Sequence, residues 1–174
     1  NVSPKGEFEY LFLEYFDQME AWADAAVKSL KASGYKQLYQ QSIDAGYMVH
    51  GEYNYHNILF DATSEKDNYG HRKLNVYTVN FDHFKKNVQV EDLYYFLRKA
   101  MEKQGFKEWI SDGILNAYSA TIPLGKNELE YLKNRLMYPE KFFKVANSYY
   151  HSNKAWISIK NVEKMQMAVR QMKE

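Results

Sequence analysis

Apolar residues recur at three- and four-residue steps through the first thirty positions of the chain. The members of this stripe are Phe8, Leu11, Phe12, Tyr15, Phe16, Met19, Trp22, Ala23, Ala26 and Leu30. Residues at that spacing share one face of an α-helix, so the stripe predicts a long amphipathic core helix that ends before Gly34. Weaker stripes of the same period predict six more helices, at about 35–44, 91–104, 106–118, 126–137, 140–151 and 161–172. Such a chain is expected to fold mainly as packed helices.

One region between these helices favours strands instead. The apolar run Ile58-Leu59-Phe60 is followed by a polar, turn-rich stretch, 61–72, and then by an alternating stretch, 73–81. This order predicts a β-hairpin with a long connection. Because side chains in a strand alternate between two faces, Asn80 and Asp82 are expected to project to the same side. We therefore expect an α+β protein, predominantly α-helical with a small β-hairpin, folded as a single domain over residues 1–174.

Charge and composition exclude several classes of protein. The 23 basic and 22 acidic residues are interspersed, which argues against nucleic acid as a partner. No apolar run approaches the roughly 18 residues that a membrane span needs, and no signal-peptide pattern is present, so we expect no membrane span and a cytoplasmic location. The chain has no cysteine, and its histidines lack zinc-ligand spacing. Without cysteine or a Gly-x-Ser-x-Gly motif, the usual covalent hydrolase schemes are also excluded.

A polar loop that precedes the predicted hairpin contains the residue types of phosphoryl transfer. Glu52 and Asn57 lie five positions apart, between two short apolar runs. In kinase-like enzymes a loop acid orients the attacking hydroxyl, and an Asn five residues later binds one magnesium ion. A further acid at the end of a nearby strand binds the magnesium that bridges the phosphates, and here that end holds Asn80 and Asp82. Glu52 is thus the candidate catalytic acid, and Asn57, Asn80 and Asp82 are the candidate metal ligands.

Two histidines in the loop are candidates with a structural alternative. His50 is a candidate catalytic residue, although an imidazole in such a loop more often bonds backbone groups. His56 precedes Asn57 and could contact a phosphate of a bound nucleotide, or it could face solvent. Near the end of the chain, Tyr149-Tyr150-His151 and Trp156 could stack on a sugar or seal a helix junction.

The loop and strand-end residues resemble a known superfamily pattern. His50-Gly51-Glu52, Asn57-Ile58-Leu59-Phe60 and Asn80-Phe81-Asp82 are similar to the His-Gly-Asp-x-x-x-x-Asn and Asp-Phe-Asp motifs of the aminoglycoside phosphotransferase and choline kinase superfamily. Three further stretches, 92–99, 138–144 and 152–157, resemble the spore coat CotS family within it. The last of these, Ser-Asn-Lys-Ala-Trp-Ile, is the most specific to that group.

This resemblance implies a fold, cofactors and partners. It implies the C-terminal lobe of the kinase-like fold, with a smaller β-rich N-terminal lobe that is absent from this chain and would be its covalent partner. It also implies ATP and magnesium as cofactors, and a small-molecule or saccharide acceptor. Spore coat proteins are implied as partners, which adds the spore coat as a possible location. By position, Asp92 matches an acid that braces the catalytic loop from the following helix.

Two motif positions depart from the superfamily, and they leave three hypotheses. Glu52 stands where the motif has the catalytic Asp, and Asn80 stands where it has the principal metal-binding Asp. The first hypothesis is a CotS-like protein that is catalytically degenerate. The second is an active kinase in which Glu52 acts as base while Asn57 and Asp82 hold magnesium. The third is a helical interaction module with no pocket between Glu52, Asn57 and Asp82.

Overall fold

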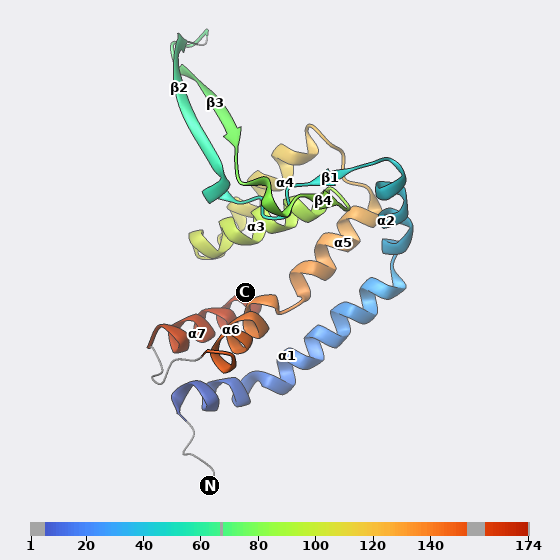
Figure 1. Ribbon diagram of the computed structural model, residues 1–174, viewed down its shortest axis with the longest axis vertical. Helices are drawn as coiled ribbons and strands as arrows, with labels where there is room; N and C mark the ends of the chain where they lie inside the picture. Colours follow the sequence, from blue (N-terminus) through green and yellow to red (C-terminus); the bar gives the residue numbers. More distant parts are fainter. Residues whose placement is uncertain (1–5, 67, 153–158, 174) are drawn as a thin grey trace. The chain divides into compact units, whose positions relative to one another are not determined.

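Seven α-helices and two antiparallel strand pairs form the part of the chain that the structure describes, residues 6–66, 68–152 and 159–173 of a computed structural model (Figure 1). The helices are α1 (Glu7–Ala32), α2 (Tyr35–Asp44), α3 (Val90–Gln104), α4 (Glu108–Ser119), α5 (Lys126–Met137), α6 (Glu140–Tyr150) and α7 (Ile159–Lys173). The strands are β1 (Met48–Val49), β2 (Ile58–Lys66), β3 (Arg72–Thr78) and β4 (Lys85–Lys86). Two short 3-10 helices, η1 (Tyr55–Asn57) and η2 (Phe81–His83), complete the list. The expected class, predominantly α-helical with a small β-hairpin, is confirmed.

The contacts divide the chain into two compact units, one made of residues 1–35 with 129–174 and the other of 36–128. In the first unit α7 packs against both α1 and α6. Its buried core consists of Phe8, Met19, Phe142, Val145, Ala146, Val162, Met165, Ala168 and Val169. The apolar stripe of α1 supplies the first two of these residues, as its helical spacing predicted. That both units belong to one domain stays a prediction.

Of the aromatic residues near the end of α6, Tyr149 packs against this core and Tyr150 lies at its half-exposed edge. The Tyr149 ring stacks on Phe8 with 3.8 Å between centroids, and its hydroxyl donates a 2.5 Å hydrogen bond to Glu9. The other carboxylate oxygen of Glu9 accepts from the backbone N–H of Gly6 at the start of α1. Tyr150 contacts both Phe8 and Phe12 edge-on. These rings therefore seal a helix junction. Trp156 lies outside the described residues.

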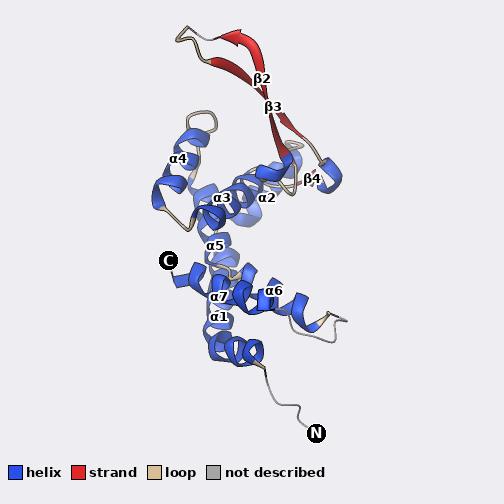
Figure 2. Cartoon of the chain, turned by 90° about the vertical axis from the view of Figure 1, so that its left-hand side faces the viewer, coloured by secondary structure: helices blue, strands red, loops and turns tan. Residues whose placement is uncertain are grey.

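The hairpin in the 36–128 unit is longer than the sequence indicated. Residues 61–66 were predicted to be connection, but they continue β2, and their partners in β3 include Asn75 and Leu74. The polar composition of this stretch misled the prediction, because strand formation depends on the cross-strand neighbours as well as on the composition of the segment itself. The hairpin projects from the helices of its unit (Figure 2). Leu59, Phe60, Leu74, Val76 and Tyr77 on it are all at least half exposed.

The end of β3 also differs from the prediction. Asn80 has φ 64° and ψ 58°, in the left-handed region, and residues 81–83 form the 3-10 helix η2. The expectation that Asn80 and Asp82 project to one side of a strand is therefore wrong, because the strand ends at Thr78. A second antiparallel pair, β1 with β4, aligns Met48 with Lys86 and was not foreseen. Strands of two residues show no alternation that a sequence pattern could reveal.

None of the helices in the described ranges is long and apolar enough to cross a bilayer.

Candidate functional site

The loop between β1 and β2 is anchored by Asp92, in the first turn of α3. One carboxylate oxygen accepts a 2.6 Å hydrogen bond from the backbone N–H of His50, and the other accepts a 3.0 Å bond from that of Gly51. Burial raises the pKa of Asp92, while these two hydrogen bonds oppose the rise. The contact expected from the resemblance is thus present, and it fixes the start of the loop to a helix.

Gly51 allows the loop to approach the turn that follows β3. Its φ of +84° lies in the left-handed region, and an added Cβ would come within 2.3 Å of the backbone oxygen of His83. Only glycine avoids both the backbone strain and this steric clash. The loop and η2 are therefore held in direct backbone contact.

Both ring nitrogens of His50 are engaged by backbone groups. Nε2 lies 2.8 Å from the carbonyl oxygen of Val79, so it must donate, and Nδ1 accepts a 3.2 Å bond from the N–H of Glu52. This pairing defines the neutral tautomer that carries its proton on Nε2. The ring is buried and lies 4.7 Å from that of Phe81. These contacts favour the structural role for His50, and its part in catalysis stays a prediction.

The tip of the loop is organised by asparagine side chains. The amide of Asn54 and that of Asn57 both donate to the carbonyl oxygen of Glu52, at 2.8 and 3.0 Å. The side-chain oxygen of Asn54 accepts from the N–H of His56 and caps η1. Sequence reasoning missed Asn54, although an Asn before a short turn is a common side-chain cap. The loop acid is thus fixed at its backbone, while its carboxylate is exposed.

The two candidate metal ligands, Asn57 and Asn80, are bonded to each other. Because the Asn57 amide nitrogen donates to Glu52, its side-chain oxygen faces Asn80 and accepts a 2.9 Å bond from the Asn80 amide nitrogen. Neither amide can be flipped without placing two donors or two acceptors together. Asn57 is also joined to the end of β3, since its carbonyl oxygen accepts from the N–H of Val79. The oxygen that would bind a cation is used within the protein.

The remaining candidates lie on exposed positions around this pair. The Glu52 carboxylate is 3.8 Å from His83 Nε2 on η2, and both side chains are exposed. Asp82, beside His83, is exposed as well. The His56 ring is exposed and lies 4.2 Å from that of Tyr55. No sequence signal indicated His83, because its approach to Glu52 depends on the tertiary contact at Gly51.

The donor set does not fit a magnesium site in this arrangement. Magnesium prefers charged carboxylate oxygens in near-octahedral geometry, and one of the oxygens expected to bind it, that of Asn57, already accepts a hydrogen bond from the Asn80 amide. Among the residues the structure describes, no three His, Asp or Glu side chains are grouped so as to hold a metal ion. The Asn80 side chain brings no net charge in place of the missing acid.

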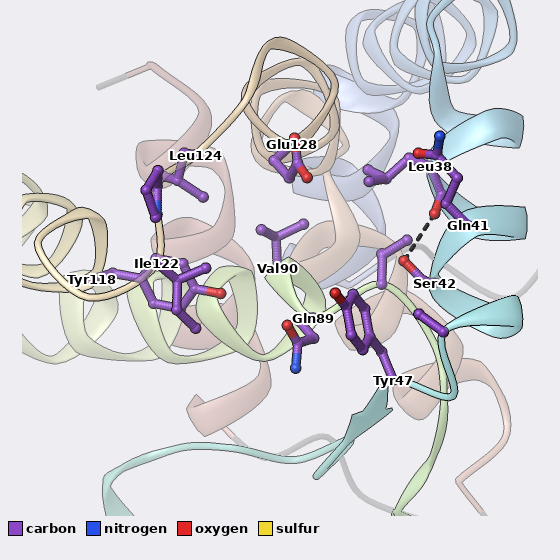
Figure 3. Close-up of a pocket in the computed structure, with 13 residues that line it drawn as sticks. Leu38, Gln41, Ser42, Tyr47, Gln89, Val90, Tyr118, Ile122, Leu124 and Glu128 are labelled. Carbon is purple, nitrogen blue, oxygen red and sulfur yellow. Dashed lines mark hydrogen bonds between the residues drawn. The ribbon is translucent and has the colours of Figure 1, made fainter.

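A separate cavity of about 320 Å³ lies between α2, the start of α3 and the α4–α5 connection (Figure 3). The Tyr47 ring points into it, and the Ser42 hydroxyl beside it donates to the Leu38 carbonyl oxygen of the same helix. Tyr118 and Glu128 line the opposite side; burial raises the pKa of Tyr118, and the charges of Asp92 and Glu128 add to the rise. None of the candidate site residues lines this cavity.

Comparison of the coordinates with solved structures identifies a crystal structure of an aminoglycoside phosphotransferase from Alicyclobacillus acidocaldarius subsp. acidocaldarius DSM 446. The match has a TM-score of 0.80 at 15% sequence identity and covers 99% of this chain. It covers 48% of the other chain, so this chain spans about half of that protein's length. No family model and no curated protein sequence matches the chain. The chain therefore has the kinase-like fold of an aminoglycoside phosphotransferase.

Proposed function

We propose that this chain is the C-terminal lobe of a CotS-like protein with a kinase-like phosphotransferase fold that has lost its catalytic metal site. The fold match and the loop motifs support the phosphotransferase ancestry. The stretches 92–99 and 138–144 support the spore coat assignment by their sequence resemblance. Residues 153–157 of the third stretch lie outside the described part of the chain.

The observation that carries the proposal is the hydrogen bond from the Asn80 amide to the Asn57 side-chain oxygen. A metal ligand at position 57 would have to direct that oxygen at a cation, and a carboxylate at position 80 would share the cation. Here the amide proton takes the place of the positive charge between the two side chains. Phosphoryl transfer depends mainly on magnesium-centred charge stabilisation, so its loss leaves little catalysis.

Under this proposal the protein acts by binding other proteins and does not transfer a phosphoryl group. Its partners are spore coat proteins, and the loop, Glu52 and the exposed η2 turn are the remains of a site for nucleotide and acceptor. The location is the cytoplasm of the sporulating cell and then the coat.

An active ATP-dependent kinase for a small molecule or saccharide is the second candidate. The observation that favours it is the geometry of Glu52, whose backbone carbonyl is held by two amides while its carboxylate is exposed beside His83. In that case Glu52 serves as base, and Asn57 with Asp82 binds magnesium once the Asn80 side chain turns away.

Isothermal titration of magnesium and ATP into the full-length protein distinguishes the two candidates. The proposal predicts no magnesium-dependent ATP binding by the natural protein and a gain of binding in Asn80→Asp. An Asn68→Asp variant, which adds the same charge at an exposed turn of the hairpin, is the matched control and should gain nothing. If the natural protein binds magnesium-ATP and Asn80→Asp changes little, the kinase candidate replaces the proposal.

A further inference from the structure

Helix α4 leaves part of its apolar surface uncovered. Its Ile110, Ile114 and Leu115 side chains are only partly buried, and none of its residues is fully buried. The Trp109 side chain is 66% exposed. An exposed Trp beside partly exposed aliphatic side chains forms an apolar surface that is available for binding.

A cavity of about 520 Å³ lies along this surface, between α3 and α4. Its walls are mostly apolar and include Phe96 and Ala100 from α3 and Trp109, Ile110 and Ile114 from α4. A second cavity of about 350 Å³ shares Phe96, Gly113 and Ile114 with it and extends to Tyr53 in the loop. Volumes of this size and composition are typical of sites for small organic molecules.

Gly113 is exposed and lines both cavities. It lies within α4 and has no left-handed φ, and a Cβ added to it would meet no atom within 4 Å. Backbone geometry and crowding therefore do not require glycine here. Glycine is unfavourable inside a helix, and here its missing side chain leaves space along both cavities that it lines.

One charged side chain, Lys103, lines the larger cavity. Its ammonium lies 4.5 Å from the centroid of the Tyr55 ring, with Gln104 beside it. The acid of the smaller cavity, Asp92, already accepts two backbone hydrogen bonds. An apolar cavity with a cation and an amide at its edge is complementary to a molecule with an apolar body and one anionic group.

We propose that the α3–α4 cavity binds a free amphipathic carboxylate, of the class of medium-chain fatty acids. The alkyl body lies against Phe96, Trp109 and Ile114, and the carboxylate pairs with Lys103. Tyr55 belongs to both the cavity wall and η1, so the bound molecule contacts the loop that holds Glu52 and Asn57. This site does not depend on the proposed loss of the metal, because none of its lining residues is a metal candidate.

Calorimetric titration with decanoate, below its micelle concentration, tests the proposal on the full-length protein. Decanoate should bind, whereas decyltrimethylammonium, with a similar body and the opposite charge, should not. Gly113→Leu fills the cavity and should abolish binding, while Gly113→Ala should retain it and stabilise the helix. Lys103→Gln should weaken decanoate binding by about tenfold, in line with the loss of a charge-assisted contact.

Several results would overturn the site. They are failure of decanoate to bind, equal binding of the cationic analogue, and unchanged affinity in a folded Gly113→Leu. If Gly113→Leu does not fold by circular dichroism, Ala100→Leu fills the same cavity from α3 and replaces it. Binding to small unilamellar vesicles of phosphatidylglycerol without binding of free decanoate would assign the surface to a membrane and also reject the proposal.

Discussion

The side-chain amide of Asn80 donates a 2.9 Å hydrogen bond to the side-chain oxygen of Asn57. The two asparagines that the sequence analysis named as candidate metal ligands are thereby joined directly to each other. Because Asn57 also donates to the Glu52 carbonyl oxygen, the loop and the end of β3 form one connected polar network. The Asn80 side chain therefore helps to hold the loop against the end of β3.

Replacing Asn80 with Asp should destabilise the protein in the absence of divalent cations. The carboxylate would face the Asn57 oxygen, and two acceptors without a donor between them cost about 1–3 kcal/mol. The left-handed backbone adds no confounding strain, since Asp tolerates it nearly as well as Asn. Urea unfolding with and without magnesium measures the effect, and magnesium should restore much of the loss. Equal unfolding midpoints in both buffers would contradict the cation-substitution argument; Asn68→Asp is the charge control.

Asp92→Asn should loosen the loop. An amide offers one acceptor oxygen where the carboxylate offers two, so one of the N–H groups of His50 and Gly51 loses its partner at about 1–3 kcal/mol. Chemical denaturation measures the loss, and amide hydrogen exchange should show weaker protection at those two residues. Asp112→Asn, at an exposed position of α4, is the matched control. Unchanged exchange at His50 and Gly51 would show that Asp92 does not anchor the loop.

Gly51→Ala and Gly46→Ala separate steric clash from backbone strain. Both glycines have positive φ, +84° and +73°, but a Cβ at Gly51 meets the backbone of His83 whereas one at Gly46 meets nothing within 4 Å. Gly46→Ala should cost about 1–2 kcal/mol, the usual left-handed penalty. Gly51→Ala should cost clearly more, because η2 must also move. Similar thermal unfolding temperatures for the two variants would refute the close approach.

The Glu9–Tyr149 hydrogen bond should make stability depend on pH at the acid end. That bond is the largest cause that lowers the pKa of Glu9 below its ordinary value of 4.5. A carboxyl whose pKa is lower in the folded state stabilises it above pH 4.5, and this contribution is lost as pH falls through the folded pKa. In urea unfolding between pH 6 and 3, Glu9→Gln should lose less stability than the natural chain. Tyr149→Phe should reproduce that weaker dependence, and parallel curves for all three proteins would exclude the bond as the cause.

The helices could be predicted from the sequence because their apolar spacing records the face that each one buries. The predicted helices 35–44 and 126–137 agree with α2 and α5 to the residue. In both, the apolar spacing and a flanking glycine or proline together indicate where the helix begins and ends. Asp92 could be placed from its position in the motif. The predictions that were wrong concern backbone conformation. The left-handed turn at Asn80 and the added length of β2 cannot be recognised from side-chain periodicity.

The candidate site shows the same limit. The residue types and the five-residue step at Glu52 and Asn57 identified the loop, but not which side chains bond to one another. The Asn57–Asn80 bond depends on the carbonyl oxygen of Glu52, which fixes the orientation of one amide and thereby that of the next. Such chains of donors and acceptors become visible only when the loop and the end of β3 are brought together in space.

The exposed hairpin has a consequence for how the chain opens. Neither face of β2–β3 is covered over most of its length, and its Lys73–Glu65 ion pair is between exposed side chains, where such pairs add little. Two-stranded hairpins alone are marginally stable in water. The backbone amides of residues 62–66 and 72–74, toward the far end, should therefore exchange with solvent through local fraying, while those of α3 exchange only through larger openings. The far end of the hairpin would then populate many conformations at equilibrium. Pairing with another strand would therefore cost little free energy.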